Sequence, residues 1–542
     1  MRRALPICVQ DFREVREGNY LYVDKTDMIP RILSDGAKVH LCTRPRRFGK
    51  SLNLSMLDAF LNLGYPHDNT WFDGLKVSDC RGFDPHRNAH PVIYFDFKDL
   101  NATSYEDFLR KLGLNLSRLY RKYGYLADSE RLDRADRMDY ESIITRTADS
   151  AEIEYSLRNL SDMLFKHHGR KVVVLLDEYD SPLHNAYGTT FHGDVLGIMR
   201  GMLSSALKGN ESLAFGVVTG VMQIAKESII SGLNNLEVNN IFNSDFDEMF
   251  GFTDDEVRAI CDEYGHPDKY DEAREWYDGY RFGNTDVYNP WSVLKFVKSG
   301  FVPRTYWAGT SGNSIIDTLL DNADGKTFDE IGLLARGVPA PKTVDPTVTF
   351  ADLRGRPDNI YSVMVMSGYL RAEPSGRSHM LSLPNGEMCT LFGEMVSRYL
   401  ERRCGDSDIL RMIMDLTDAI LVDDVPVIGR SLSELFHSSL GYMMLDSEHV
   451  YQAFIAAILL NLSRRYDILL ESKVPGPPHV VIELKRSDSD AGDDRVLSDA
   501  RRALEQISKK GYTTGLRGNV LMYGIAFRGK EPTIVSDTTT LL

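Results

Sequence analysis

The segment from Lys38 to Leu63 constrains the fold of this chain more than any other. It consists of a short apolar strand, a turn that ends in Gly49-Lys50-Ser51, and a run from Leu52 with apolar residues at helical spacing. Strand, turn and helix in this order predict a phosphate-binding loop. Gly49 would let phosphate approach the backbone, Lys50 would supply positive charge, and the Ser51 hydroxyl could ligate Mg²⁺. We therefore expect a nucleotide site here.

One position departs from the usual pattern G-x-x-x-x-G-K-[ST] for such loops. Arg44 stands where that pattern has its first glycine. A Gly-Lys-Ser tripeptide also occurs by chance in ordinary turns, so the loop needs support from elsewhere in the chain.

That support comes from a second apolar run, Lys171 to Leu176, which ends in the acid pair Asp177-Glu178. A buried parallel strand delivers carboxylates to its C-terminal edge in this way. Asp177 is predicted to hold Mg²⁺, and Glu178 is predicted to polarise a water against the γ-phosphate. A core strand followed by a solvated turn is the alternative. Together with the Gly-Lys-Ser turn, the acid pair favours a nucleoside triphosphatase that uses Mg²⁺.

Strands and helices alternate through this part of the chain. Strand candidates at 91–98 and 213–220 flank the acid-tipped strand, with helical patterns at 104–124 and 140–168 in between. This alternation predicts a parallel sheet covered by helices. Thr219, at the end of its strand, either senses the γ-phosphate or forms part of a Thr-Gly turn. The predicted nucleotide contacts are Arg46, Arg47, Phe48, Gly49, Lys50, Ser51, Leu52, Asp177 and Thr219.

Further residues are candidates for the base and for the transition state. Tyr22 and Arg13 precede the loop and would either cover the base or simply pack. Arg281, in an aromatic-rich stretch, is predicted to reach the phosphates from a lid, and Arg46 or Arg47 are alternatives for this role. Such an arginine could also act across a subunit contact, so a homo-oligomer stays open.

Composition bounds the class of protein. A chain of 542 residues exceeds one domain, and a net charge of -15 argues against a protein coated in nucleic acid while allowing a local basic groove. The six cysteines show no C-x-x-C spacing, which predicts a reduced chain without structural zinc. No apolar run reaches membrane-spanning length and no signal segment is evident. We expect a cytoplasmic protein that does not associate with membranes.

The last hundred or so residues change character. Tyr466-Asp467 and the strand ending Glu483-Leu484-Lys485 are followed by a helical pattern, which is the layout of a PD-(D/E)xK nuclease core. Alternation places Glu483 and Lys485 on one face of the strand, and a hairpin could bring Asp467 beside them. Asp467 and Glu483 would hold Mg²⁺ over a scissile phosphate, and Lys485 would orient the attacking water. Similar spacings also occur on solvated strand faces.

With both sites in view, the chain resembles a prokaryotic family in which an AAA-ATPase-like domain is joined to a C-terminal PD-(D/E)xK nuclease-like domain. The stretches that carry the resemblance include YLYVDKTDMI, RPRRFGKSL, VVVLLDEYDSP, VVTGVMQIAKESIISGLNNL, WYDGYRF, VYNPWSVL, VYQAFIAAILLNL, VVIELK and ALEQISKKGY. The family's loop also contains RPRRFGKS, so Arg44 matches it. The resemblance implies ATP and Mg²⁺ binding through Lys50, Ser51, Asp177 and Glu178, and a nuclease-like centre at Asp467, Glu483 and Lys485 supported by Glu448 and Gln506.

The chain departs from the family at one point. Members commonly carry a longer segment with glycine and arginine before the metal-binding aspartate, whereas here Leu462 to Tyr466 leads almost directly into Asp467. Either Asp467 is that acid and its loop is shortened, or the motif strand has been lost and Glu483 has no metal partner.

We predict an α/β protein with three parts: a P-loop NTPase domain at 1–250, a mainly helical lid region at 251–440 and a restriction-endonuclease-like domain at 441–542. The predicted function is an ATPase coupled to a Mg²⁺-dependent nuclease that acts on DNA or RNA. The alternative is an ATP-operated signalling switch whose tail keeps the nuclease fold as a binding surface. A nucleotide-binding scaffold without turnover is a further alternative.

Overall fold

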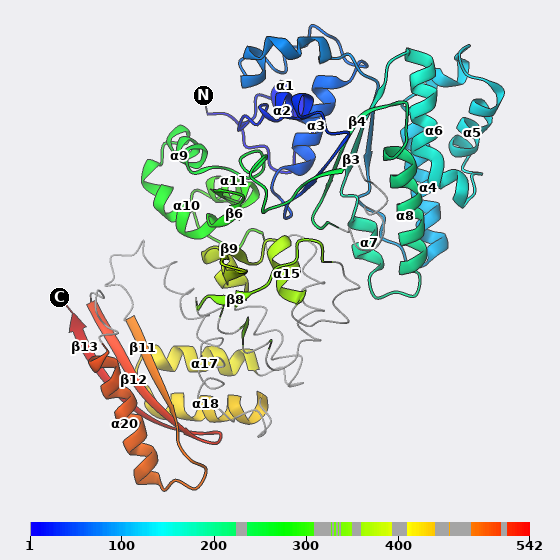
Figure 1. Cartoon of the computed structure of the whole chain (residues 1–542). Helices are drawn as coiled ribbons and strands as arrows, with labels where there is room; N and C mark the ends of the chain where they lie inside the picture. Colours follow the sequence, from blue (N-terminus) through cyan, green and yellow to red (C-terminus); the bar gives the residue numbers. More distant parts are fainter. Residues whose placement is uncertain are drawn as a thin grey trace. The chain divides into compact units, whose positions relative to one another are not determined.

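The structure is a computed structural model that describes residues 2–223, 236–307, 338–348, 359–392, 409–439, 479–510 and 518–541, together with 327, 330, 331, 334 and 455. The chain divides into two compact units (Figure 1). The first unit comprises Met1–Thr310 and Pro341–Met380, and the second unit comprises Ser311–Ala340 and Leu381–Leu542. The predicted boundaries at 250 and 440 lie inside these units, and the division into three functional domains stays a prediction.

A five-stranded parallel sheet, in the strand order β2-β3-β4-β1-β5, forms the centre of the first unit. Its strands are β1 (Val39–Thr43), β2 (Val92–Asp96), β3 (Val172–Asp177), β4 (Leu213–Gly220) and β5 (Leu236–Asn239). Every residue of β1 and β3 is buried, as expected for parallel strands covered on both faces. The predicted α/β class with a parallel sheet is confirmed.

Helices connect these strands. They are α1 (Phe12–Glu17), α2 (Met28–Asp35), α3 (Lys50–Leu61), α4 (Tyr105–Arg121), α5 (Arg134–Thr145), α6 (Ser150–His168), α7 (Ser181–Ala186) and α8 (His192–Leu207), with short 3-10 turns η1 (Lys76–Asp79), η2 (Arg81–His86) and η3 (Gly124–Asp128). The predicted helix at 140–168 is in fact parts of two helices. Arg146 ends α5 in the left-handed conformation, and the Asp149 side chain caps α6 by accepting from the Glu152 amide.

The two faces of the sheet have different roles. Leu41, Leu176 and Val218 belong to the large apolar cluster that the sheet forms with α4, α6 and α8. Because side chains alternate along a strand, Asp177 and Thr219 point to the other face. That face carries α3, which contacts β3 and β4 (Figure 1). The polar ends of these strands therefore share a face with the helix that follows the phosphate loop, residues 44–49.

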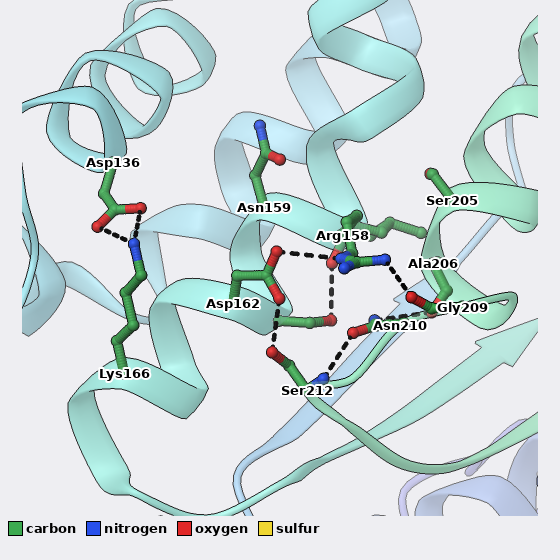
Figure 2. A network of polar contacts seen from close by, with 12 residues as sticks. Asp136, Arg158, Asn159, Asp162, Lys166, Ser205, Ala206, Gly209, Asn210 and Ser212 are labelled. Carbon is green, nitrogen blue, oxygen red and sulfur yellow. Dashed lines mark hydrogen bonds and ion pairs between the residues drawn. The ribbon is translucent and has the colours of Figure 1, made fainter.

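A polar network fixes the turn that leads into β4 (Figure 2). Ser212 Oγ donates to Asp162 at 2.5 Å, and the Ser212 amide donates to Asn210 Oδ1 at 3.0 Å. Arg158 on α6 pairs with Asp162 at 3.0 Å and donates to the Gly209 carbonyl at 2.9 Å. Arg158 and Asp162 of α6 thus bind polar groups of the turn and fix the start of β4.

The remainder of the first unit is mixed and not only helical. It contains α9 (Asp254–Glu263), η4 (Pro267–Lys269), α10 (Tyr270–Tyr277), α11 (Pro290–Lys298), α15 (Asn359–Met366), the hairpin β6 (Tyr280–Phe282) and β7 (Thr285–Val287), and a small sheet of β8 (Ala340–Lys342), β10 (Ser378–Ser382) and β9 (Arg371–Ser375). Thr253 and Glu256 form a capping box at the start of α9. An apolar cluster that includes Val257, Tyr277 and Phe296 holds α9, α10 and α11 together.

The second unit contains a three-stranded sheet, in the order β11-β12-β13, and helices. Its described elements are α17 (Ile409–Leu421), α18 (Val425–Ser439), β11 (His479–Arg486), α20 (Asp493–Lys509), β12 (Gly518–Arg528) and β13 (Glu531–Leu541). β12 runs parallel to β11 and antiparallel to β13. Gly524 lets α20 pack closely on β12, because a side chain there would collide with the Ala500 carbonyl.

Candidate functional site

The phosphate loop joins β1 to α3 through two residues with left-handed backbone. Arg47 has φ 69° and Gly49 has φ 86°, and Lys50 then begins α3. The first amides of a helix have no partner within the helix, so those of Lys50, Ser51 and Leu52 are available at its N-terminus. The helix dipole adds partial positive charge at the same place. The structure thus gives the predicted Gly49-Lys50-Ser51 turn the geometry of an anion site.

The Lys50 side chain is enclosed by the loop that precedes it. It is only 6% exposed, and its Nζ donates to the carbonyls of Arg44 and Pro45 at 3.0 and 2.9 Å. Burial lowers the pKa of Lys50, and the negative charges of Glu178 and Asp177 oppose that shift. The predicted lysine and the predicted acid pair therefore belong to one site.

Asp177 and Thr219 lie side by side at the C-terminal edge of the sheet. Thr219 Oγ1 donates to Asp177 Oδ1 at 2.5 Å, and the Glu178 amide donates to the same oxygen at 3.0 Å. Asp177 is buried, whereas Glu178 is partly exposed and has a left-handed backbone with φ 49°. The carboxylate of Asp177 is held in one orientation, while that of Glu178 can reach solvent.

Asp96 is an additional acid at this edge to which the sequence analysis gave no role. It ends β2 and is the register partner of Asp177. Burial and, after it, the charge of Asp177 together raise the pKa of Asp96 to about 7. The strand pattern at 91–98 indicates an acid at a strand end, but only the strand order shows that Asp177 is its neighbour.

Asp180 is a further acid at this edge of the sheet to which the sequence analysis gave no role. It accepts hydrogen bonds from the amides of Val221 and Met222, both at 2.8 Å, and lies 3.2 Å from His184 Nε2. Burial alone would raise the pKa of Asp180, but the charge and hydrogen bond of His184 and the two amides lower it to about 2. The sequence signal was the third acid in Asp177-Glu178-Tyr179-Asp180.

The Arg44 side chain explains why the loop lacks its first glycine. It is fully buried and directed toward β5, where Nη1 donates to the Asn239 carbonyl at 2.8 Å and Nη2 to the Phe246 carbonyl at 3.3 Å. The guanidinium also lies over the rings of Phe250 and Phe282. Burial lowers the pKa of Arg44 to about 10. The side chain therefore occupies space away from Lys50 and leaves the phosphate side of the loop open.

The aromatic ring of Phe48 anchors the loop. It is 1% exposed and packs against Tyr280 and Phe282, with ring centroids 4.9 and 5.1 Å away. Only the backbone of Phe48 is thus left for the predicted nucleotide contact. Arg47 is exposed and lies over the Trp291 ring at 4.5 Å. Arg46 is partly buried, and its carbonyl accepts from Trp307 Nε1 at 3.3 Å.

Arg281 does not reach the phosphate loop in this structure. Its neighbours on β6, Tyr280 and Phe282, hold Phe48, so alternation directs Arg281 to the opposite face of the hairpin. There its Nη1 pairs with Asp286 at 3.1 Å. The role of Arg281 at the phosphates, like that of Arg46 or Arg47, stays a prediction.

The residues proposed for the base are engaged in packing. Tyr22 is buried, and its hydroxyl donates to Met56 Sδ at 3.3 Å. Arg13 pairs with Asp11 at 2.6 Å and lies over the Tyr65 ring. These contacts favour the packing alternative for both residues.

In the second unit, Glu483 and Lys485 share one face of β11 as predicted. Lys485 Nζ lies 3.8 Å from Glu483 Oε1, and the Gln506 amide on α20 donates to the same oxygen. Asp467 and Glu448 lie outside the described residues. Within the described part of the chain, no three His, Cys, Asp or Glu residues are grouped so that they could hold a metal ion. Of the predicted nuclease-like centre, the described residues therefore include Glu483, Lys485 and Gln506.

Comparison with known families covers the part of the chain that holds the first of the two sites. Residues 6–230 match the family model AAA-ATPase_like, described as predicted AAA-ATPase. This part of the chain is AAA-ATPase-like. The AAA-ATPase-like domain includes the phosphate loop, the acid pair and Thr219, and the match ends before the second unit.

Two individual proteins extend the comparison. The uncharacterized protein in the vnfD 5' region of Azotobacter chroococcum mcd 1 is 28% identical over 557 residues, which cover 98% of each chain. The similarity therefore continues beyond the AAA-ATPase-like domain, although that protein's name states no activity. A solved structure of the Aeropyrum pernix ORC2 protein, in ADPNP and ADP complexes, covers 72% of this chain and 98% of that one. With 14% identity and a TM-score of 0.28, it carries no argument about fold or function.

The described helices were also compared with the length and hydropathy that a bilayer requires. None of them is both long and apolar enough to span a membrane.

Proposed function

We propose that the AAA-ATPase-like domain binds MgATP and hydrolyses it. The observation that carries this proposal is the enclosure of Lys50, whose ammonium lies at the N-terminus of α3 and donates to two neutral carbonyls. A buried ammonium is stabilised far more by charged partners than by neutral ones. Phosphate oxygens at the helix N-terminus would provide such partners, and Lys50 would exchange the carbonyls of Arg44 and Pro45 for them.

The oxygen atoms of Ser51 and Asp177 fit Mg²⁺, which prefers hard oxygen ligands. When bound, the ion would neutralise charge on the phosphate oxygens. The chain contributes a fixed carboxylate, because the Thr219 hydroxyl and the Glu178 amide both donate to Asp177 Oδ1. Because both hydrogen bonds are made to Oδ1, the other oxygen of Asp177 would be the ligand for the cation.

Glu178 and Thr219 would complete the reaction. The Glu178 carboxylate is partly exposed at the edge of the sheet, where it can accept a hydrogen bond from the attacking water and orient it. Thr219 is hydrogen-bonded to Asp177 in this structure, and rotation of its hydroxyl toward a γ-phosphate would link nucleotide state to the position of β4.

Calorimetric titration of the full chain with ATP in the presence of Mg²⁺ tests the nucleotide site. Lys50→Ala is expected to abolish measurable binding, because loss of a buried charged partner costs about 2–5 kcal/mol. Lys298→Ala, which changes an exposed lysine at the end of α11, is the matched control and should bind ATP like the native chain. Unchanged affinity in Lys50→Ala would refute the site.

We also propose a role for the second unit, as a Mg²⁺-dependent nuclease that acts on DNA or RNA. The supporting observation is the cluster of Glu483, Lys485 and Gln506 on one face of β11 and α20. Lys485 would orient the attacking water and offset charge that develops on the scissile phosphate. The described residues provide one carboxylate, so the metal site depends on Asp467 as the second. If that acid is not in place, the unit would serve as the binding surface of an ATP-operated switch.

Incubation of the full chain with plasmid, single-stranded DNA and RNA, with Mg²⁺ and with or without ATP, distinguishes the two roles. A nuclease should cleave at least one substrate, and Glu483→Gln should remove that cleavage. Glu505→Gln on the exposed side of α20 is the matched control and should leave cleavage unchanged. Absence of cleavage under every condition, with ATP binding retained, would support the switch instead.

A further inference from the structure

A cavity of about 330 Å³ lies in the first unit beside the β6–β7 hairpin. Apolar side chains such as Ile241, Phe242 and Ala372 form much of its wall, and Arg281 and His379 contribute polar groups. Pockets that bind small molecules typically measure about 300–1,000 Å³ and combine an apolar wall with a few polar groups. This cavity has that size and composition.

The polar groups in the wall have unused hydrogen-bonding capacity. Arg281 uses Nη1 on Asp286, at 3.1 Å, and a guanidinium has five N–H donors in all. His379 Nδ1 is buried and has no hydrogen-bond partner among the described residues. The His379 ring lies 5.0 Å from that of Phe242, which fixes its position at the wall.

The charged group in the cavity wall is Arg281, which also pairs with Asp286. Burial lowers the pKa of His379, so its ring is neutral near pH 7, and Arg281 is the one charged side chain among the lining residues. The carboxylate of Asp286 is shared with Arg371, at 3.2 Å, and Arg371 in turn pairs with Glu373. Asp286 therefore does not fully satisfy Arg281, and a ligand that brings an acceptor with negative charge is favoured.

We propose that this cavity binds a small carboxylate with an apolar body, such as an arylalkanoate. The carboxylate accepts from Arg281 and from an N–H at Nδ1 of His379, and the apolar body lies against Ile241, Phe242 and Ala372. In this arrangement the donors in the cavity wall meet an acceptor of the ligand, and the apolar part of the wall meets apolar ligand atoms.

The position of the cavity connects it to the phosphate loop. Tyr280 and Phe282, on either side of Arg281 in β6, hold the ring of Phe48 on the opposite face of the hairpin. A ligand at Arg281 therefore contacts the strand that anchors the loop, and its binding is expected to change ATP affinity. This second effect rests on the proposed nucleotide site, whereas the binding of the carboxylate does not.

Calorimetry on the full nucleotide-free chain with 4-phenylbutyrate and its neutral amide, 4-phenylbutyramide, tests the proposal. The acid should bind saturably, and the amide should bind at least about tenfold more weakly because it cannot form the charged pair with Arg281. Arg281→Gln should weaken binding of the acid by a similar factor, and Arg110→Gln, at an exposed arginine of α4, is the matched control. No saturable binding of the acid, or equal affinity for acid and amide, would overturn the proposal.

The link to the nucleotide site is tested separately. Saturating 4-phenylbutyrate should change the affinity of the native chain for ATP by about threefold or more, a modest coupling between two sites. An unchanged ATP affinity would overturn the link. Lys50→Ala should bind the acid normally while it fails to bind ATP, so the two proposals can fail independently.

Discussion

The two candidate sites use the same residue types but differ in how the fold assembles them. Lys50 lies inside a loop and meets acids from β3, which are far from it in the sequence. Lys485 and Glu483 are two positions apart on one strand, so any strand would bring them to the same face. Proximity in the first unit therefore requires this particular fold, and proximity in the second unit does not.

The two sites also differ in how deeply their lysines are buried. Lys50 is 6% exposed, whereas the Lys485 side chain is 27% exposed. A charged group in an enclosed site depends strongly on each partner, while a partly solvated one can exchange partners with water. The comparison predicts that changes in the first site have larger effects than changes in the second, and four experiments test this from the largest effect to the smallest.

Replacement of the residue that orients water should have the largest effect. Glu178→Gln is expected to lower the rate of ATP hydrolysis by about 10²–10⁴-fold, because a neutral glutamine polarises the attacking water much less than a carboxylate does. ATP affinity should stay close to the native value, since Glu178 is not a phosphate ligand in the proposed site. Phosphate release and calorimetry measure the two quantities. Equal turnover in native and variant protein would show that another group, such as Asp96, does this work.

The second-largest effect is expected when the aromatic ring of Phe48, which anchors the phosphate loop, is removed. Phe48→Ala removes a buried ring from between Tyr280 and Phe282 and should cost about 3–5 kcal/mol of unfolding free energy. Phe48→Leu is the control and should cost less, because it retains most of the apolar contact. Urea unfolding of the full chain gives both values. An alanine variant as stable as the leucine variant would show that the loop does not depend on this anchor.

Lowering the pH should reduce the free energy of unfolding, because Asp180 becomes protonated and loses its charged contacts. Its pKa falls from an ordinary 3.8 to about 2 in the folded chain, so its contribution to stability is complete above pH 3.8 and is lost as the pH falls through about 2. That difference corresponds to about 2 kcal/mol. Unfolding free energies between pH 2 and 5 should therefore decline more steeply in the native chain than in Asp180→Asn. Parallel pH profiles would contradict the assignment.

The smallest effect is expected in the second unit. Gln506→Ala removes the hydrogen bond to Glu483 and should cost about 1 kcal/mol, because Gln506 and Glu483 both keep access to solvent. Urea unfolding measures this cost, with Glu505→Gln as the control on the same helix. A loss of several kcal/mol would show that this cluster is as tightly built as the nucleotide site and would remove the contrast between the units.

Local patterns in the sequence were sufficient to predict the parts of the fold that depend on near neighbours. The strand and turn at 38–51 and the acid-tipped strand at 171–177 follow from apolar runs and turn residues, and both appear in the structure. The face shared by Glu483 and Lys485 also follows from alternation alone. The break between α5 and α6 was missed because Arg146, unlike glycine, gives no signal of a left-handed backbone.

Features that depend on distant contacts could not be predicted. The direction of the Arg44 side chain is set by carbonyls at Asn239 and Phe246, and the role of Asp96 depends on which strand lies beside β2. The direction of Arg281 could not be predicted either, because the sequence does not show which face of the β6–β7 hairpin packs on Phe48. In each case the deciding partner is far away along the chain and becomes known only from the topology.

The buried guanidinium of Arg44 has a consequence for how such loops can diverge. Replacement by glycine would restore the common motif, but it would leave a hole between Phe250 and Phe282 and deprive two carbonyls of their donor. Sequences that regain the glycine should therefore also differ in the segment that follows β5. Covariation between position 44 and that segment would show that the phosphate loop and the residues packed behind it evolve together.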